Sequence, residues 1–225
     1  GSIASQVRAQ PSAGFSIVSY TGTGPNATVG HGLNDTPGFY IIKNRDEVKN
    51  WAVGHSALPT GNYVLLNLTN NAGTSAAMLN NTAATSSVFS VGTNTTVNGS
   101  ADNLIAYCFA PVEGYSAMGS YTGNGSADGP FVYTGFRPAI IIQKRTDSAG
   151  SWTLVDTARD IDNPAALELL PNSGAAEYDN TSLFDILSNG FKVRATFSNL
   201  NANGGSFIYI AFAENPFQAN GGLAR

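Results

Sequence analysis

The sequence predicts an all-β protein built from two tandem antiparallel β-sandwich (jelly-roll-like) repeats that are related by internal duplication. The first observation is a constant spacing: the stretch from Gly14 to His55 recurs from Gly114 to Asp156, with identical residues 101 positions apart. The second is a series of short apolar runs separated by turns rich in Gly, Pro and Asn, and the third is the near absence of helical periodicity. A fixed period marks a repeat architecture, and short strands with regular turn signals indicate a sandwich.

The two copies share turn residues and strand residues alike. The identical pairs are Tyr20-Thr21-Gly22 with Tyr121-Thr122-Gly123, Pro37 with Pro138, Lys43 with Lys144, Asp46 with Asp147, and Trp51 with Trp152. The closing strands match as well, but Ile105 and Phe109 lie 103 positions before Ile208 and Phe212, so the second copy has gained two residues in its middle. We expect these isoleucines and phenylalanines to occupy equivalent core positions.

Composition is typical of a folded β protein with few charged residues. Apolar residues make up 42% of the 225 residues and include 12 Phe, 9 Tyr and 2 Trp, enough to build a core, while charged residues reach only 12%. The net charge is −4 without a basic run, which argues against nucleic acid as a partner. No apolar run approaches the length of a membrane-spanning helix, so membrane insertion is not expected either.

The first repeat reads as seven strands. Alternating residues in the opening strand are followed by a Gly-rich turn that ends at Pro25, and the continuous apolar run Phe39–Ile42 predicts a strand buried on both faces. The segment Thr69–Thr85 is rich in Asn, Ala, Thr and Ser, which predicts a long loop or one weak strand. The expected strands are Gly14–Tyr20, Thr28–Leu33, Gly38–Lys43, Trp51–His55, Tyr63–Leu68, Ser87–Val91 and Asn103–Ala110.

The second repeat follows the same plan. Its expected strands are Tyr115–Tyr121, Pro130–Tyr133, Ala139–Lys144, Trp152–Asp156, Leu167–Leu170, Gly190–Thr196 and Ser206–Ala213. The stretch Pro164–Leu170 has two interpretations, since Pro at the first position also suits two turns of helix. Its counterpart Tyr63–Leu68 is a short apolar run with an aromatic and a β-branched residue, which favours a strand.

These boundaries divide the chain into five parts. Residues 1–13 form a polar N-terminal tail, and residues 218–225 form a C-terminal tail, neither of which is expected in the core. Residues 14–110 and 114–217 are the two sandwich repeats, joined by the short linker 111–113. Either tail could still pair with a neighbouring subunit.

Motifs for catalysis or cofactor binding are not found. The sequence lacks GxSxG, P-loop, HExxH and CxxC patterns, and Cys108 lies in an apolar run that predicts a small buried hydrophobe. The loop residues Asp156, Asp160 and Asp162 are the densest oxygen donors and are candidate ligands for calcium, without an EF-hand spacing. A solvated turn explains the same cluster. No cofactor other than calcium is expected.

Aromatic residues supply the remaining candidate ligand contacts. Trp51 and Trp152 begin equivalent strands, where an exposed indole would stack on a sugar ring and a buried one would pack in the core. Tyr20 and Tyr121 stand at strand ends in the two Tyr-Thr-Gly turns, close to where a surface ligand would bind.

Several strings in the chain resemble a known family. They are GFSIVSYTGTG, VGHGL, PGFYIIKNR, NGSADNLIAYCFAPVEGYS, GSYTGNGSADGPFVYTGFRPAIIIQKR and IYIAFAENPF. Together they are similar to duplicated domains of uncharacterised tail-fibre and other virion proteins of marine and freshwater bacteriophages, over Gly14 to Phe217. The resemblance implies a virion surface or extracellular location and a host-contact role, and it carries over no functional residues.

Two functions of different class follow. The first is a non-enzymatic attachment module of a tail-fibre type that binds a host-surface glycan. The second is a structural subunit that assembles into a fibre, filament or capsid decoration without a dedicated ligand. Low charge leaves few residues to protect sheet edges, so we expect a homo-oligomer or fibre neighbours in either case.

Overall fold

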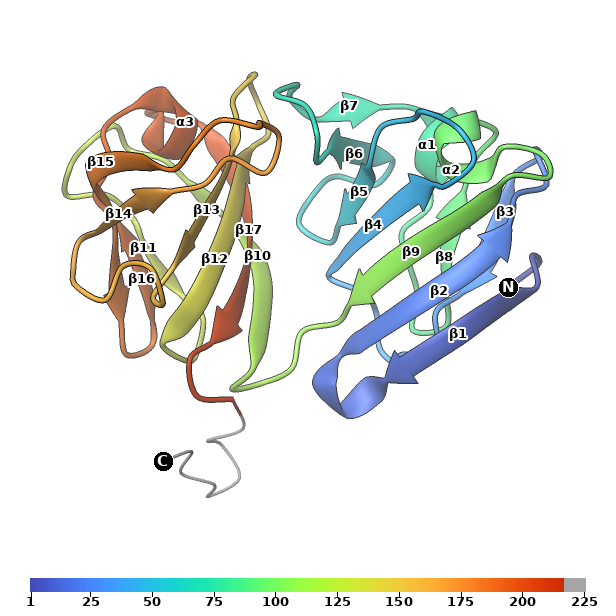
Figure 1. Ribbon diagram of the computed structural model, residues 1–225, viewed down its shortest axis with the longest axis horizontal. Helices are drawn as coiled ribbons and strands as arrows, with labels where there is room; N and C mark the ends of the chain where they lie inside the picture. The colour runs from blue at the N-terminus through green and yellow to red at the C-terminus, as the bar shows by residue number, and fades with distance from the viewer. Residues whose placement is uncertain (217–225) are drawn as a thin grey trace. The chain divides into compact units, whose positions relative to one another are not determined.

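The computed structural model describes residues 1–216, and every pair of named strands in it is antiparallel, which confirms the all-β prediction (Figure 1). The chain divides into two compact units. The first unit comprises Gly1–Leu68 and Ala72–Pro111, and the second comprises Thr69–Asn71 and the chain from Val112 onward. Within residues 1–216, no helix is both long and apolar enough to cross a membrane.

The first unit is built on one large sheet of order β1-β2-β9-β4-β5-β6-β7, with a small sheet of β3 and β8. The closing strand β9 lies between β2 and β4 (Figure 1). The elements are β1 (Ser5–Gln10), η1 (Pro11–Ala13), β2 (Phe15–Thr21), β3 (Ala27–Gly30), β4 (Phe39–Asn44), β5 (Ala52–His55), β6 (Asn62–Leu65), β7 (Gly73–Thr74), α1 (Ala76–Leu79), β8 (Val88–Val91), α2 (Thr95–Asn98) and β9 (Asn103–Phe109).

The second unit holds two four-stranded sheets, of order β10-β17-β12-β13 and β11-β16-β15-β14. The elements are β10 (Ser116–Thr122), β11 (Phe131–Tyr133), β12 (Pro138–Arg145), β13 (Trp152–Asp156), β14 (Ala165–Glu168), β15 (Tyr178–Leu187), β16 (Gly190–Val193), α3 (Ser198–Asn201) and β17 (Ser206–Ala213). The stretch around Pro164 is therefore a strand, as its counterpart in the first unit predicted.

Each unit has its own core, formed between its two sheets. In the first unit, alternate residues of β9 point inward, and Leu104, Ala106 and Cys108 are fully buried against Phe89 of the small sheet. In the second unit, Phe207, Tyr209 and Ala211 of β17 take the same inward role. Burial raises the pKa of the Cys108 thiol to about 12, so this cysteine acts as an apolar core residue, as predicted.

One buried asparagine in each unit ties the first long loop to the helix before the closing strand. The Asn98 amide accepts a hydrogen bond from the Thr23 N–H at 2.8 Å and donates to Pro25 O at 2.6 Å and Gly92 O at 2.9 Å. The Asn98 side chain is fully buried, so its own amide atoms depend on these protein hydrogen bonds. The amide therefore fixes the course of the loop that follows β2.

The same arrangement occurs in the second unit. The Asn201 amide accepts from the Asn124 N–H at 2.8 Å and donates to Ser126 O at 2.7 Å and Ala195 O at 2.9 Å. Tyrosine hydroxyls reinforce both sites, because Tyr20 donates to Val97 O at 2.7 Å and Tyr121 donates to Leu200 O at 2.8 Å. We call this set of contacts the asparagine lock.

The other matched residues form equivalent turn contacts. Lys43 Nζ donates to Asn44 O at 2.6 Å, and Lys144 Nζ donates to Arg145 O at 2.8 Å, so each ammonium satisfies carbonyls of the turn after its strand. The carboxylate of Asp46 accepts from the Asn103 N–H at 2.7 Å, and that of Asp147 accepts from the Ser206 N–H at 3.0 Å. In both units, this aspartate fixes the start of the closing strand.

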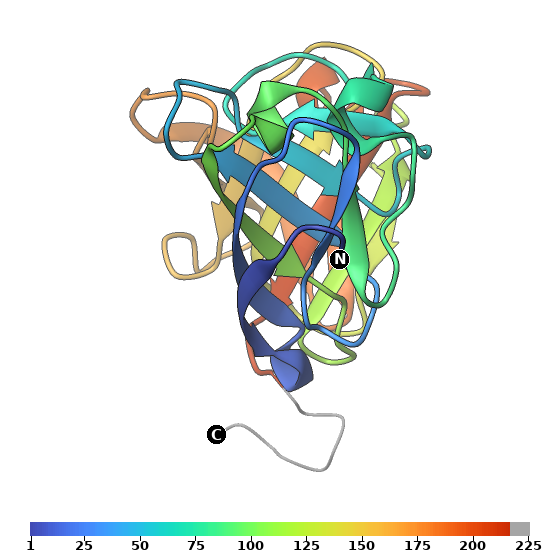
Figure 2. The same cartoon turned by 90° about the vertical axis from the view of Figure 1, so that its right-hand side faces the viewer.

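The prediction that residues 1–13 form a tail outside the fold is wrong. Ser5–Gln10 forms strand β1, which pairs with β2 along the edge of the large sheet (Figure 2), and Ile3 is 6% exposed and bridges to Val29. Sequence reasoning missed this strand because backbone hydrogen bonds hold it, and its side chains give no clear apolar alternation. The predicted C-terminal tail, residues 218–225, lies outside the described residues.

Two further expectations need correction. Strand β15 was not expected, because a left-handed residue, Thr181 at φ 65°, and a register shift in its pairing with β14 break the alternation of its apolar residues. The predicted core role of Phe109 and Phe212 is also wrong, since both are only partly buried. The strand period is 2, and the neighbouring positions such as Cys108 are the ones that face the core.

We expect Asn201→Ala to lower the free energy of unfolding of the second unit by about 2–4 kcal/mol, because the hydrogen bonds of this buried amide to Asn124, Ser126 and Ala195 are lost. Asn203→Ala is the matched control, since Asn203 is exposed and makes no hydrogen bond within the described residues; its effect should stay within about 0.5 kcal/mol. Chemical denaturation followed by circular dichroism measures both. Equal stabilities for the two variants would contradict the asparagine lock.

Candidate functional site

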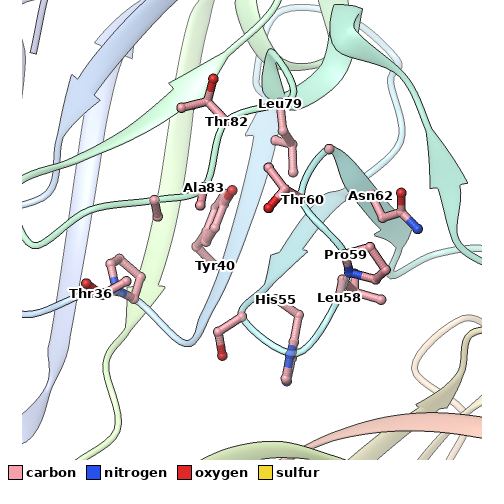
Figure 3. A pocket seen from close by; sticks show the side chains of 14 residues that line it. Thr36, Tyr40, His55, Leu58, Pro59, Thr60, Asn62, Leu79, Thr82 and Ala83 are labelled. Carbon is pink, nitrogen blue, oxygen red and sulfur yellow. The ribbon is translucent and has the colours of Figure 1, made fainter.

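The first unit contains a pocket of about 250 Å³ between strand β4, the turn after β5 and the segment after α1 (Figure 3). Its lining carries no Asp, Glu, Lys or Arg. The lining residues are Thr36, Pro37, Tyr40, His55, Ser56, Leu58, Pro59, Thr60, Gly61, Asn62, Leu79, Thr82, Ala83 and Ala84. We call this site the Tyr40 pocket. Its walls are aliphatic and aromatic, and hydroxyl and amide groups stand at its rim.

Tyr40 forms the floor of the pocket, and the backbone of the facing strand positions its ring. Tyr40 on β4 lies directly opposite Gly54 on β5. A Cβ at Gly54 would stand 2.2 Å from the ring, so the ring lies flat against the glycine backbone. On its other side the ring stacks on Phe89, with centroids 5.4 Å apart. Only glycine at position 54 leaves room for this ring.

The Tyr40 hydroxyl is the unusual group of the site. The Tyr40 side chain is 5% exposed, yet its hydroxyl makes no hydrogen bond to any residue of the described chain. The equally buried Tyr20 and Tyr121 both donate to backbone carbonyls. In Figure 3 the Tyr40 ring extends between Ala83 and Thr60. The Tyr40 hydroxyl belongs to the pocket lining without a partner in the described chain, so it is available to a ligand.

Burial, with the Cys108 thiol nearby, raises the pKa of Tyr40 well above its ordinary value. The phenol is therefore neutral at physiological pH and can donate as well as accept a hydrogen bond. This combination suits a ligand hydroxyl, which itself both donates and accepts. A carboxylate or phosphate would lie here without a cation, because the pocket lining contains no Lys or Arg.

His55 lies at the pocket mouth on the last residue of β5. Its Nδ1 accepts a hydrogen bond from the Ala57 N–H at 3.0 Å, so the neutral ring carries its proton on Nε2. The ring also meets Phe39 edge-on, with centroids 6.0 Å apart, and is 7% exposed. These contacts fix the imidazole as part of the wall. The position corresponds to Asp156 in the second repeat, so the second unit does not repeat this wall.

The rim of the Tyr40 pocket contains residues with positive φ angles, a backbone conformation that few residue types adopt. Gly61 has φ +86°, and a Cβ there would stand 2.4 Å from the Asn81 side-chain oxygen. Asn80 and Asn81 are left-handed in succession after α1, at φ 51° and 46°. Asparagine tolerates this region better than most residues. These turns bring Thr60 and Thr82 to opposite sides of the pocket (Figure 3).

The two tyrosines predicted to contact ligand do not lie at the surface. Tyr20 is 4% exposed and Tyr121 is 8% exposed, and burial raises the pKa of both above the ordinary value. Their hydroxyls belong to the asparagine lock. The prediction was wrong because a Tyr at a strand end can point into the core when a buried backbone carbonyl, here that of Val97 or Leu200, accepts a hydrogen bond from its hydroxyl.

The two tryptophans behave differently. Trp152 is 1% exposed, so the sugar-stacking interpretation fails for it and core packing holds. Trp51 is partly buried, and its role in ligand contact stays a prediction. Both backbone N–H groups donate to an asparagine side chain, Trp51 to Asn67 at 3.0 Å and Trp152 to Asn172 at 2.7 Å.

Two of the three aspartates predicted to bind calcium, Asp156 and Asp160, make contacts with other protein groups. Partial burial alone would raise the pKa of Asp156, but hydrogen bonds from Arg159 lower it overall, and the two side chains form an ion pair at 2.6 Å. Asp160 accepts from the backbone N–H groups of Ala166 and Leu167, while Asp162 is exposed. Within residues 1–216, no three His, Cys, Asp or Glu side chains gather as a metal site.

Sequence reasoning missed the Tyr40 pocket as a whole. Tyr40 stands inside an apolar run that predicted only a buried strand, and Ala83 and Thr82 fall in a segment that predicted only a loop. One signal was present: at the repeat spacing, Tyr40 aligns with Ile141, so the first copy alone carries an aromatic hydroxyl here.

We expect Gly54→Ala to displace the Tyr40 ring and to destabilise the first unit by about 1–3 kcal/mol, because the added Cβ overlaps the ring. Gly174→Ala is the control, since a Cβ there meets nothing within 4 Å. Denaturation gives the stabilities, and near-ultraviolet circular dichroism reports the tyrosine environment. An unchanged spectrum and stability for Gly54→Ala would show that the ring is not fixed as described.

Comparisons with known proteins give one family and no characterised relative. A model for a domain of unknown function, DUF7483, matches residues 1–216. No curated protein matches the chain, and no solved structure matches it. Because the match spans almost the whole chain, the protein belongs to the DUF7483 family.

Proposed function

We propose that this protein is a non-enzymatic attachment module whose Tyr40 pocket binds one sugar unit of a neutral surface glycan. The observation that carries the proposal is the Tyr40 hydroxyl, which belongs to the pocket lining and has no hydrogen-bond partner within residues 1–216. A ligand hydroxyl placed there would complete its hydrogen bonding. The apolar faces of a sugar ring would meet the aliphatic walls formed by Leu58, Leu79 and Pro59.

Size and charge support the same ligand class. The pocket volume of about 250 Å³ lies just below the range of about 300–1,000 Å³ that holds drug-sized ligands, which suits a single ring. The lining has no charged side chain, so a neutral ligand loses little by leaving water. Thr60, Asn62 and Thr82 supply hydroxyl and amide groups that can bond to the remaining sugar hydroxyls (Figure 3).

A binding role without catalysis fits the chemistry of the lining. Hydrolysis of a glycosidic bond uses a pair of carboxylates, and the Tyr40 pocket offers none. The buried carboxylate Glu168 lies in the other unit, where it accepts hydrogen bonds from Thr153 at 2.6 Å and Asn180 at 2.8 Å. One sugar site of this kind is weak, and display in several copies would raise the avidity.

The proposal also covers the evolutionary origin of the two units and the location of the protein. The asparagine lock and the paired lysine and aspartate contacts recur in both units, which supports descent of two jelly-roll-like sandwiches from one duplicated domain. The likeness of the sequence to tail-fibre and virion proteins supports a place on a virion surface or another extracellular assembly, with a host glycan as partner. The alternative role, self-assembly into a fibre or decoration, is supported by an open sheet edge in the second unit.

The pocket predicts which sugars bind. Methyl glycosides of neutral hexoses should perturb the nuclear magnetic resonance signals of Tyr40 and Thr60, with Kd on the order of 1 mM, whereas hexuronates should not. Tyr40→Phe should weaken binding about fivefold to tenfold, because the ligand loses one hydrogen bond. The stability of this variant should not fall, since the hydroxyl has no partner within residues 1–216.

Tyr178→Phe is the matched control, because Tyr178 is exposed in the second unit. It should bind sugars as the unchanged chain does. Binding that survives Tyr40→Phe unaltered would remove the pocket from the proposal. Turnover of a polysaccharide by the purified chain, abolished by replacing one Asp or Glu, would overturn the non-enzymatic role.

A further inference from the structure

Strand β10 forms an open edge in the second unit. In the sheet order β10-β17-β12-β13, it pairs with β17 alone. The hydrogen bonds from Ala213 N to Tyr115 O (2.8 Å) and from Gly123 N to Gly205 O (2.9 Å) show that odd-numbered residues of this segment bond toward β17. Because direction alternates along a strand, Met118, Ser120 and Thr122 direct their N–H and C=O groups to the other side. Within residues 1–216, those outward groups have no partner.

The equivalent edge in the first unit is covered. There, Gly14 and Gly22 bond toward β9, so Ile17 and Ser19 face outward. Strand β1 pairs with them, with Arg8 opposite Ile17 and Gln6 opposite Ser19. By the repeat spacing, Ile17 corresponds to Met118 and Ser19 to Ser120. The first unit therefore shows that this kind of edge accepts an antiparallel strand.

The chain preceding β10 supplies no such strand to the second unit. The turn into β10 begins as the turn into β2 does, since Val112 O accepts from the Tyr115 N–H just as Pro11 O accepts from the Gly14 N–H, both at 2.9 Å. Upstream of Val112, however, the residues at the position of β1 belong to β9, the closing strand of the first unit. They are already paired on both sides, with β2 and β4.

The open edge also lacks the usual protection. The β10 sequence Ser-Ala-Met-Gly-Ser-Tyr-Thr contains no charge and no Pro, whereas β1 carries Arg8. In the other sheet of the same unit, Phe131 and Tyr133 of the edge strand β11 are 47% and 67% exposed. Their counterparts by strand pairing, Thr28 and Gly30, are bonded by N-terminal residues. An edge strand without charge or Pro is open to pairing with another chain.

We propose that the β10 edge of one chain pairs with the β10 edge of a second copy, antiparallel and about a two-fold axis. The edge is self-complementary: with Ser120 opposite Ser120 of the partner subunit, Met118 lies opposite the partner's Thr122, and all of these residues direct their backbone groups outward. No like charges oppose each other. The sheet that contains β10 then continues into the same sheet of the partner subunit. A dimer displays two Tyr40 pockets. The inference does not depend on that site.

Analytical ultracentrifugation of the full chain over a wide concentration range tests the proposal. The unchanged chain should form a dimer, and Ser120→Pro should weaken the dimer at least about tenfold, because proline removes an outward donor. The ladder to β17 stays intact, since position 120 directs its N–H away from it. Val7→Pro is the matched control on the outer edge of β1, and it should dimerise as the unchanged chain does.

Ser120→Lys separates pairing from misfolding. Two lysines opposite each other at the axis should dissociate the dimer at low salt and allow recovery as salt rises. Circular dichroism confirms that each variant is folded. A monomeric unchanged chain, or a dimer insensitive to both Ser120 variants, would overturn the proposal.

A synthetic peptide of residues Ile3–Gln10 tests whether the β10 edge instead accepts the N-terminal strand of another chain. It should not dissociate the dimer. If the peptide binds the β10 edge while the chain stays dimeric, the edge accepts an N-terminal strand and is not the dimer contact, so the β10 pairing would be wrong.

Discussion

A single buried side-chain amide in each unit constrains the rest of its structure. Asn98 and Asn201 each bond to backbone groups of a loop distant in sequence and to a carbonyl six residues earlier, and neither asparagine is exposed. Because each amide itself lies away from water, the bonds of one set reinforce one another. The amide thereby holds the loop after the opening strand against the helix before the closing strand. With both ends fixed, β2 and β9, or β10 and β17, pair in one register and the core between the sheets follows.

The two units differ where function is proposed. In the first unit, Tyr40 replaces the aliphatic residue found at Ile141, and its hydroxyl ends in a charge-free pocket. In the second unit, the edge that β1 covers in the first is left open. A shared scaffold thus carries one small ligand site and one strand-pairing surface. This arrangement suits a protein that acts by display and assembly, since a weak site gains avidity when copies are joined.

The sequence was sufficient to predict an all-β protein with antiparallel sheets and most of its strands, because period-2 patterns and Gly-rich turns are local signals. The repeat also identified Lys43, Asp46 and their counterparts 101 positions later. These residues make equivalent turn contacts in the two units. It could not reveal β1, which backbone bonds hold, or the inward turn of Tyr20, which depends on a carbonyl distant in sequence. The Tyr40 pocket was equally hidden, since a missing hydrogen bond is a three-dimensional property. A difference between repeats, rather than a likeness, was the signal to follow.

Native-state hydrogen exchange of backbone amides tests the asparagine lock most directly. Thr23 and Asn124 lie in loops, yet each donates its N–H to the buried amide oxygen at 2.8 Å. We predict that both amides exchange as slowly as that of Val18 in strand β2, because only opening of the whole unit would release them. Exchange of Thr23 and Asn124 as fast as that of Gly174, an exposed loop residue, would contradict it.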